Sequence, residues 1–168
     1  MRFRKERLFD FPCGEFLKLF MENEEPAYAM EELENVTMWK VVKEQDDGVK
    51  RIGTKEWCAH AQIPKPLQHI IIPKMLTWYE HSEWDRKTNV YSFRIEPFYL
   101  KNKLVCYGKT SYKEKGKDQT LRTFEVALKV KIPILGQIAE NAMIGHLGRN
   151  EEQDYKLCRK AIEKVKGK

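Results

Sequence analysis

The hydrophobic and polar positions of the chain change their period near residue 136. From residue 124 to 132, every second position is apolar, namely Phe124, Val126, Leu128, Val130 and Ile132. A period of two predicts a strand with one buried face and one solvated face. From Gln137 to about Val165 apolar residues recur every three or four positions, which predicts a long amphipathic helix. Pro133 and Gly136 separate the two patterns.

Further elements are predicted upstream of this pair. Strand patterns cover residues 2–11, 36–43, 52–61, 76–84, 90–96 and 104–112. Polar turn sequences lie at 44–48, 85–89 and 113–119. Residues 13–21 and 24–33 are predicted to be short helices. Because hairpins connect the strands, we predict an α+β fold in a single domain spanning 1–168, with a curved antiparallel seven-stranded sheet (β-α-α-β6) wrapped around a long C-terminal helix.

This order of elements and one motif resemble the START-like (SRPBCC, helix-grip) superfamily over essentially the whole chain. The segment 130–140, Val-Lys-Ile-Pro-Ile-Leu-Gly-Gln-Ile-Ala-Glu, is similar to the strand-to-helix junction of a group of small bacterial START-like proteins of unassigned function. The resemblance implies that a small apolar ligand binds in a cavity between the sheet and the C-terminal helix.

A second stretch resembles the PRELI-type lipid-transfer domains. It consists of Thr54–Trp57, a proline-rich insert and Trp78–Ser82. The chain departs from that subfamily at the Pro133–Gly136 junction and in its paired N-terminal helices, so the choice between the two subfamilies stays open at the level of the sequence.

Composition and charge narrow the class of protein. With 42% hydrophobic and 11% aromatic residues, the 168-residue chain is not intrinsically disordered. No apolar run approaches the ~20 residues that a membrane span needs, and the N-terminal segment lacks the apolar core of a secretory signal. We therefore expect a cytoplasmic protein.

The formal net charge of +6 is unevenly distributed. Residues 101–131 hold nine lysines or arginines against three acids, whereas 22–34 hold six acids and no base. Such asymmetry favours peripheral contact with an anionic membrane, although the solvated face of a sheet explains the same lysines. A nucleic-acid partner would need exposed aromatic residues among the basic ones. Here the aromatic residues alternate to the other face, which argues against nucleic acid.

The four cysteines show no metal-site spacing. Cys13, Cys58, Cys106 and Cys158 lie 45, 48 and 52 residues apart, so we predict free, mostly buried thiols. Cys58 and His60 are suitable ligand types, but no partner ligands accompany them. We predict neither a metal nor a cofactor.

The proline-rich segment 63–75 has two interpretations. Its three prolines prevent it from continuing a strand, and in helix-grip proteins this position holds a loop at the cavity mouth. As a lid, the segment would present apolar and basic side chains to a lipid surface: Lys65, Ile70, Ile71, Lys74 and Met75. Alternatively, a short helix here closes the end of the sheet.

The candidate cavity residues are the large apolar side chains predicted to face inward. They are Trp78, Trp84, Phe93, Ile95, Phe124, Val126 and Leu128 on the sheet, with Met143 and Leu147 on the helix. If they fill the interior themselves, no ligand space remains.

The predicted function is non-enzymatic binding, and transfer between membranes, of a phospholipid or other apolar small molecule. One alternative is a cavity enzyme of the polyketide-cyclase or hydratase type. Alternation places Glu80 and His60 among apolar residues, where either would act as its acid or base. A second alternative is an interaction module without a ligand.

Overall fold

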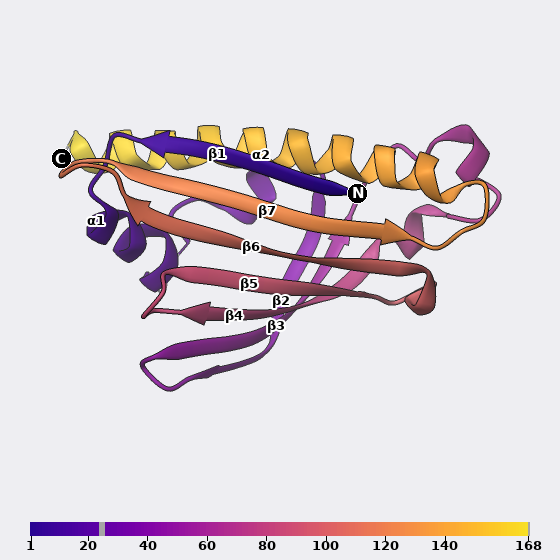
Figure 1. The fold of residues 1–168 in the computed structure, drawn as a ribbon, viewed down its shortest axis with the longest axis horizontal. Coiled ribbons are helices and arrows are strands. Elements are labelled where there is room, and N and C mark those ends of the chain that lie inside the picture. Colours follow the sequence, from indigo (N-terminus) through magenta and orange to yellow (C-terminus); the bar gives the residue numbers. More distant parts are fainter. Residues whose placement is uncertain (24–25, 168) are drawn as a thin grey trace.

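The computed structural model describes residues 1–23 and 26–167, and its strands form one antiparallel seven-stranded sheet within those residues (Figure 1). The strands are β1 (Arg2–Phe9), β2 (Val36–Asp46), β3 (Lys50–Ala59), β4 (Thr77–Asp85), β5 (Val90–Pro97), β6 (Leu104–Glu114) and β7 (Thr120–Val130). Their order is β1-β7-β6-β5-β4-β3-β2, so hairpins join all neighbours except β1 and β7. The predicted α+β helix-grip fold is therefore confirmed.

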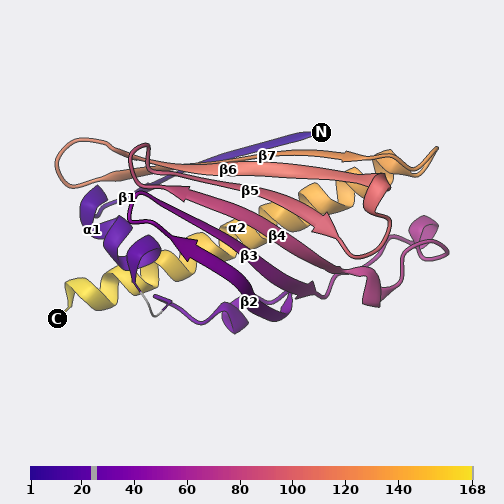
Figure 2. The same cartoon turned by 90° about the horizontal axis from the view of Figure 1, so that it is seen from below.

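The long helix α2 (Gly136–Lys166) lies on the concave side of this sheet. It runs beside β1 and β7 in Figure 1, while β2, β3 and β4 curve away from it. Figure 2 shows it crossing behind the strands along the length of the sheet. Its most buried apolar residues are Ala139, Cys158, Ala161 and Ile162. No helix in the described part of the chain combines the length and apolar character that a membrane crossing requires.

The alternation predicted for β7 is the alternation observed. Val126, Leu128 and Val130 are buried, whereas Lys129 between them is exposed. The β6–β7 register is unbroken from Leu104↔Val130 to Glu114↔Thr120. Because a slip by one residue would turn every apolar side chain to the solvent, this pattern fixes the register.

The N-terminal segment differs from the prediction in its second helix. Helix α1 (Cys13–Leu17) continues into a π-helical turn (Lys18–Glu22), close to the predicted 13–21. The predicted helix 24–33 is wrong: residues 24 and 25 lie outside the described residues, and the rest contains only the 3-10 turn Met30–Glu32.

The cause is a set of polar contacts with α2. The Gln153 side chain accepts the Glu34 N–H (3.1 Å) and donates to the Glu32 carbonyl (2.8 Å). The Asn35 amide donates to Asn150 (2.7 Å). These bonds hold the segment against the helix instead of in a helix of its own.

The junction between β7 and α2 explains the motif at 130–140. Glu140 is buried, and its carboxylate accepts the backbone N–H of Val130 (2.9 Å). This hydrogen bond and Lys129 hold the pKa of Glu140 below its usual range. Before it, Ile134 adopts φ +66° in the turn that follows Pro133. The glutamate of the motif therefore ties the helix to the strand and does not face the concave surface of the sheet.

Candidate functional site

Two buried clusters occupy the concave side of the sheet. The α1 cluster lies toward the C-terminal end of α2 and consists of Phe9, Phe11, Cys13, Phe16, Trp84, Tyr112, Cys158 and Ile162. The Leu67 cluster lies toward the N-terminal end of α2 and consists of Leu67, Cys106, Val126, Leu128, Val130 and Ala139. Each contains residues from the sheet and from α2, so the helix is anchored at both ends.

Residues of β3 and β4 on the same face that belong to neither cluster include two tryptophans, a lysine and a glutamate. The register pairs Lys55 with Glu80 and Trp57 with Trp78 on adjacent strands. Directly paired residues of an antiparallel sheet point to one face, and this face also carries Trp84 of the α1 cluster. All four side chains are partly exposed. We call Lys55, Trp57, Trp78 and Glu80 the β3–β4 block.

The carboxylate of the block is hydrogen-bonded. The Tyr91 hydroxyl, from β5, donates to Glu80 Oε1 at 2.5 Å. Burial, and then the Glu80 charge, raises the pKa of Tyr91 well above its usual value, so the phenol stays protonated. Lys55 Nζ lies 5.6 Å above the centre of the Tyr91 ring, within cation–π range.

A row of aromatic rings lines the neighbouring part of the face. Phe93 stacks on Phe124 with centroids 6.1 Å apart, and Phe124 meets Phe3 edge-on at 6.0 Å. The Phe93 ring also lies over Gly108, where a Cβ would stand 2.7 Å from Phe93 Cζ. A side chain at residue 108 would therefore displace this ring.

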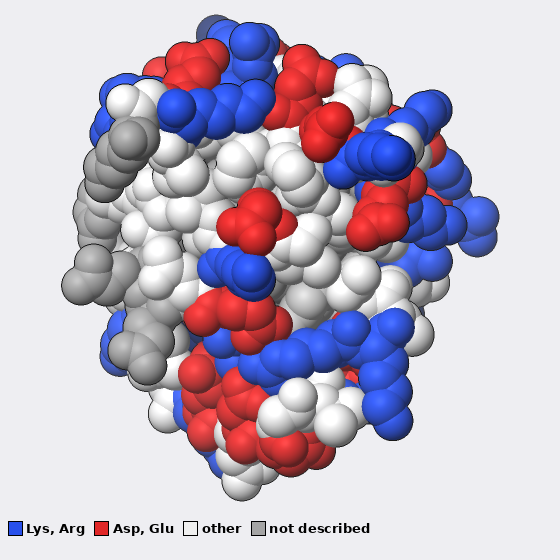
Figure 3. All heavy atoms as spheres, turned by 90° about the vertical axis from the view of Figure 1, so that its left-hand side faces the viewer, with Lys and Arg blue, Asp and Glu red and all other residues white. Residues whose placement is uncertain are grey.

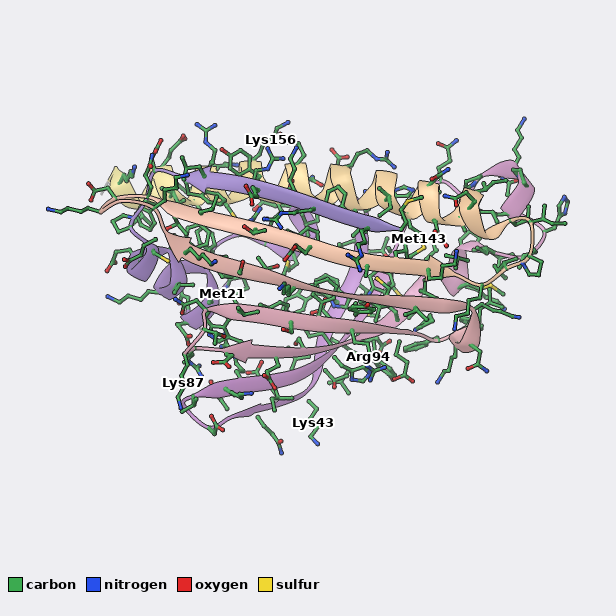
Figure 4. All side chains as sticks on the ribbon, viewed as in Figure 1. Met21, Lys43, Lys87, Arg94, Met143 and Lys156 are labelled. Atoms are coloured by element: carbon green, nitrogen blue, oxygen red, sulfur yellow. The ribbon has the colours of Figure 1, made fainter. Side chains whose placement is uncertain are left out.

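The predicted cavity residues divide into three groups. Trp84 is 2% exposed and donates its indole N–H to Glu22 (2.6 Å), so it belongs to the solid α1 cluster and not to an open wall. Val126 and Leu128 are likewise buried in the Leu67 cluster. Only Trp78 belongs to the block. The remaining five are partly buried and pack against the Leu67 cluster: Phe93, Ile95, Phe124, Met143 and Leu147. Figure 4 shows Met143 on α2 above the sheet.

The predicted acid or base His60 does not face the interior. It is exposed and lies just beyond the end of β3, where its backbone N–H donates to the Asn35 carbonyl (2.8 Å). The expected alternation fails here because the strand stops at Ala59. Glu80, in contrast, does face the concave side.

The proline-rich segment closes one end of the sheet, whereas its proposed role as a lid stays a prediction. It forms 3-10 turns at Lys65–Leu67 and Pro73–Met75. Leu67, which the sequence interpretation did not single out, is 2% exposed and plugs the end of the sheet, and Ile71 packs beside it. Ile70 and Met75 are partly exposed, whereas Lys65, Lys74 and Ile72 are exposed.

A buried ionic network joins the sheet to α2, and the sequence patterns did not lead us to predict it. Arg122 on β7 pairs with Asp154 (2.5 Å) and Glu151 (3.2 Å), and Glu151 pairs with Arg7 as well (2.8 Å). The Tyr28 hydroxyl donates to Asp154. The sequence did carry a signal for Arg122, because it lies two residues before Phe124 in the predicted alternation and therefore points to the same inward face.

The four thiols are free, with three of them buried, as predicted. Burial raises the pKa of Cys106 to about 11, so this thiol is neutral and unreactive at neutral pH. Within the described part of the chain, no three His, Cys, Asp or Glu side chains are placed to share a metal ion.

Two hollows lie away from the concave face. One, of about 440 Å³, is formed by the β6–β7 turn, Asp10 and Lys166; the other, of about 200 Å³, lies near Arg94, Lys101 and Tyr107. The first is lined mainly by exposed charged residues and is a poor site for an apolar ligand. The second has a mostly apolar lining, but it is small, and three charged residues, Arg94, Glu96 and Lys101, also line it.

No family model matches the chain, and no curated protein matches its sequence. Solved structures do match its fold. TTHA0849 from Thermus thermophilus is 19% identical with a TM-score of 0.69, covering 98% of this chain and 99% of that one. The ZhuI aromatase/cyclase from a Streptomyces species is 10% identical with a TM-score of 0.68, and the match covers 98% of this chain and 95% of that one. Norcoclaurine synthase from Thalictrum flavum is 14% identical with a TM-score of 0.63, and the match covers 94% of this chain and 85% of that one. The chain thus has the fold of START-like proteins, and the solved structures with this fold include an aromatase/cyclase and a synthase.

Proposed function

We propose that this protein binds a lipid or other apolar small molecule between the concave face of β3–β5 and α2, without catalysing a reaction. The observation that carries the proposal is the β3–β4 block, where two tryptophans remain partly exposed on the face that elsewhere forms buried core. Apolar surface left accessible inside a fold gains about 25 cal/mol per Å² when a ligand covers it.

We also propose that one end of the molecule contacts an anionic membrane, from which the ligand is taken or to which it is delivered. Ile134 is 95% exposed, and Ile72 is exposed on the neighbouring proline-rich segment. Four exposed lysines lie on these segments and on the turn before β6: Lys65, Lys74, Lys103 and Lys131. None of the four forms an ion pair within the described residues. Each lysine near an anionic surface contributes about 1 kcal/mol.

The conformation of Ile134 supports this contact. A β-branched residue at φ +66° is strained, at a cost of about 1–3 kcal/mol, and its side chain packs against nothing that would offset the strain. Retaining an isoleucine there is understandable if its side chain enters the interfacial region of a bilayer.

Ligand binding is tested by filling the site. Purified protein is extracted for copurifying lipids and examined by native mass spectrometry, and is titrated with the apolar dye N-phenyl-1-naphthylamine. Leu147→Trp on the inner side of α2 should lower the dye affinity at least about tenfold. Lys156→Trp is the control, because Lys156 points away from the sheet (Figure 4). Protein that is always empty and binds no dye contradicts the proposal.

Membrane contact is tested by co-sedimentation with vesicles of phosphatidylcholine and phosphatidylglycerol. Ile134→Asp should reduce binding severalfold. Ile52→Asp is the matched control, since Ile52 is also exposed but lies near the β2–β3 turn, at the opposite end of the sheet. Equal binding of both variants and the wild type would remove the membrane from the proposal.

A cavity enzyme of the cyclase type is the second candidate function. The observation in its favour is the hydrogen bond from Tyr91 to Glu80 on the concave face, since a carboxylate beside apolar walls is a usable acid or base. The aromatase/cyclases that share this fold make cyclisation of polyketide thioesters the reaction to assay. Turnover that Glu80→Gln abolishes would favour the enzyme over the binding protein.

A further inference from the structure

Among the hydrogen-bond donors of the β3–β4 block, the buried Trp57 indole N–H and the Lys55 ammonium have no acceptor within the described residues. The indole nitrogen of Trp57 is buried and makes no hydrogen bond within the described residues. Burying an N–H without an acceptor is unfavourable, and such groups in a native structure need an explanation. The neighbouring Trp39 ring, whose centroid lies 6.1 Å from that of Trp57, offers no acceptor atom.

Lys55 is the second unused donor. It lies two residues before Trp57 on the same face of β3, and no carboxylate of the described residues lies within ion-pair distance of its ammonium. Other lysines of this hairpin are paired: Lys40 with Glu56 at 3.0 Å and Lys50 with Glu83 at 2.8 Å. Lys55 instead lies over the Tyr91 ring.

The carboxylate of the block does not serve these donors. Glu80 pairs with Lys55 in the register, yet its hydrogen-bond partner is the Tyr91 hydroxyl. Its charge nevertheless compensates that of Lys55, so the block as a whole is neutral. A second anion beside Glu80 would be repelled, whereas a neutral acceptor would not.

We infer that the ligand carries a carbonyl oxygen, which accepts hydrogen bonds from the Trp57 indole N–H and the Lys55 ammonium. A carbonyl has two lone pairs and can satisfy both donors, and Trp57, Trp78 and Phe93 supply apolar surface for the rest of the molecule. This inference rests on the proposed function and specifies its ligand class as a ketone or an ester.

The test uses two dyes that differ only in a carbonyl oxygen. Prodan is 2-dimethylaminonaphthalene with a propionyl group at position 6, and its emission moves to longer wavelength when the carbonyl is hydrogen-bonded. We expect the wild type to bind prodan at least about tenfold more tightly than 2-dimethylamino-6-propylnaphthalene, which carries the same chain without the carbonyl oxygen. Trp57→Phe and Lys55→Met should each reduce this ratio severalfold and shift the emission of bound prodan to shorter wavelength.

Lys43→Met is the matched control, because Lys43 is exposed on β2 and pairs with Thr54 on the convex face. It should leave the ratio and the emission unchanged. Competition then separates two sources of the carbonyl: displacement of prodan by 2-acetylnaphthalene indicates an aromatic ketone, and displacement by methyl oleate an acyl ester.

The outcomes separate this inference from the proposed function. If neither dye binds, the proposed function fails. If both dyes bind equally, or if the two variants keep the wild-type ratio, the carbonyl is not recognised and the inference is overturned while apolar binding stands. Tighter binding of the anionic dye 8-anilinonaphthalene-1-sulfonate than of prodan also overturns it, since the site then selects an anion.

Discussion

The α1 cluster and the β3–β4 block lie on one face of one sheet, yet only the first is a solid core. In the α1 cluster, Phe16 packs on Phe9 at 4.8 Å and on Tyr112 at 5.6 Å, and it is 1% exposed. In the block, Trp57 and Trp78 remain partly exposed. The difference follows from coverage, since α1 and α2 close one region while β3 and β4 curve away from α2. Aromatic residues therefore serve stability in one region and remain available for binding in the other.

The charges of the two ends differ in the same way. At the α1 end, Arg86 bridges Asp46 (2.7 Å) and Glu22 (2.8 Å), and Figure 3 shows acidic and basic side chains beside one another on this end of the molecule. At the end that carries Ile134, the exposed lysines Lys65, Lys74, Lys103 and Lys131 have no such partners in the described chain. Ion pairing thus reinforces the closed end, while the free charge gathers where we propose that a membrane binds.

The largest expected change in stability distinguishes a residue of the α1 cluster from a residue of the β3–β4 block. Phe16→Ala should lower the free energy of unfolding by about 3–5 kcal/mol, because the ring is fully packed. Trp78→Ala should lower it by only about 1–2 kcal/mol, because part of the ring is already in solvent. Urea unfolding measures both. Equal losses would mean that the block is ordinary core.

A smaller loss of stability is expected at Gly108, where the Phe93 ring lies over the backbone of β6. Gly108→Ala places a Cβ 2.3 Å from the Glu125 carbonyl oxygen and 2.7 Å from Phe93, so unfolding should become easier by about 1–3 kcal/mol. Gly14→Ala meets no atom within 4 Å and lies in α1, so it should be neutral or stabilising. A tolerated Gly108→Ala would show that the Phe93 ring is free to move.

At the other end, a substitution should stabilise the protein. Ile134→Gly relieves a left-handed conformation without losing packing, and we expect a gain of about 1 kcal/mol in unfolding free energy together with weaker vesicle binding. Thermal unfolding and co-sedimentation measure the two quantities. A loss of stability would show that the isoleucine is retained for packing instead of for contact with a membrane.

The smallest effect concerns pH. Hydrogen bonds from Arg86, and then from the Gly48 N–H, lower the pKa of Asp46 to about 2 from a usual 3.8. Since the folded-state pKa is the lower one, this stabilisation is complete above pH 3.8 and is lost as the pH falls toward 2. The urea midpoint should fall over this range, and less steeply in Arg86→Met. Identical slopes would show that the pair contributes nothing to stability.

The sequence predicted the sheet well because its signal is local. Alternation over 124–132 and 90–96 gave β7 and β5 to within a few residues, and the three-to-four period gave α2. The second N-terminal helix was wrong because Glu32, near its predicted end, and Glu34 and Asn35, directly after it, form hydrogen bonds with Gln153 and Asn150, far along the chain. No local pattern carries that information.

The candidate site was predicted only in part. The alternation of side chains along β4 placed Trp78 and Glu80 on the inner face, but Trp84, which points to the same face, lies in the solid core. Alternation specifies the face to which a side chain points and not its depth of burial, which depends on what covers each position. Lys55 and Trp57 were passed over because a lysine two residues before a tryptophan carries no signal until the register sets them beside Glu80 and Trp78.

By itself, the sequence determined the order of strands and helices in the helix-grip fold and, along β5 and β7, the face to which the residues point, because periodicity and turn chemistry are properties of neighbouring residues. Only the tertiary structure decided which aromatic residues are core and which form a wall, that Leu67 plugs one end, and that Ile134 stands exposed at φ +66°. Each of these depends on how the sheet curves around α2, and that curvature arises from contacts between residues distant in the chain.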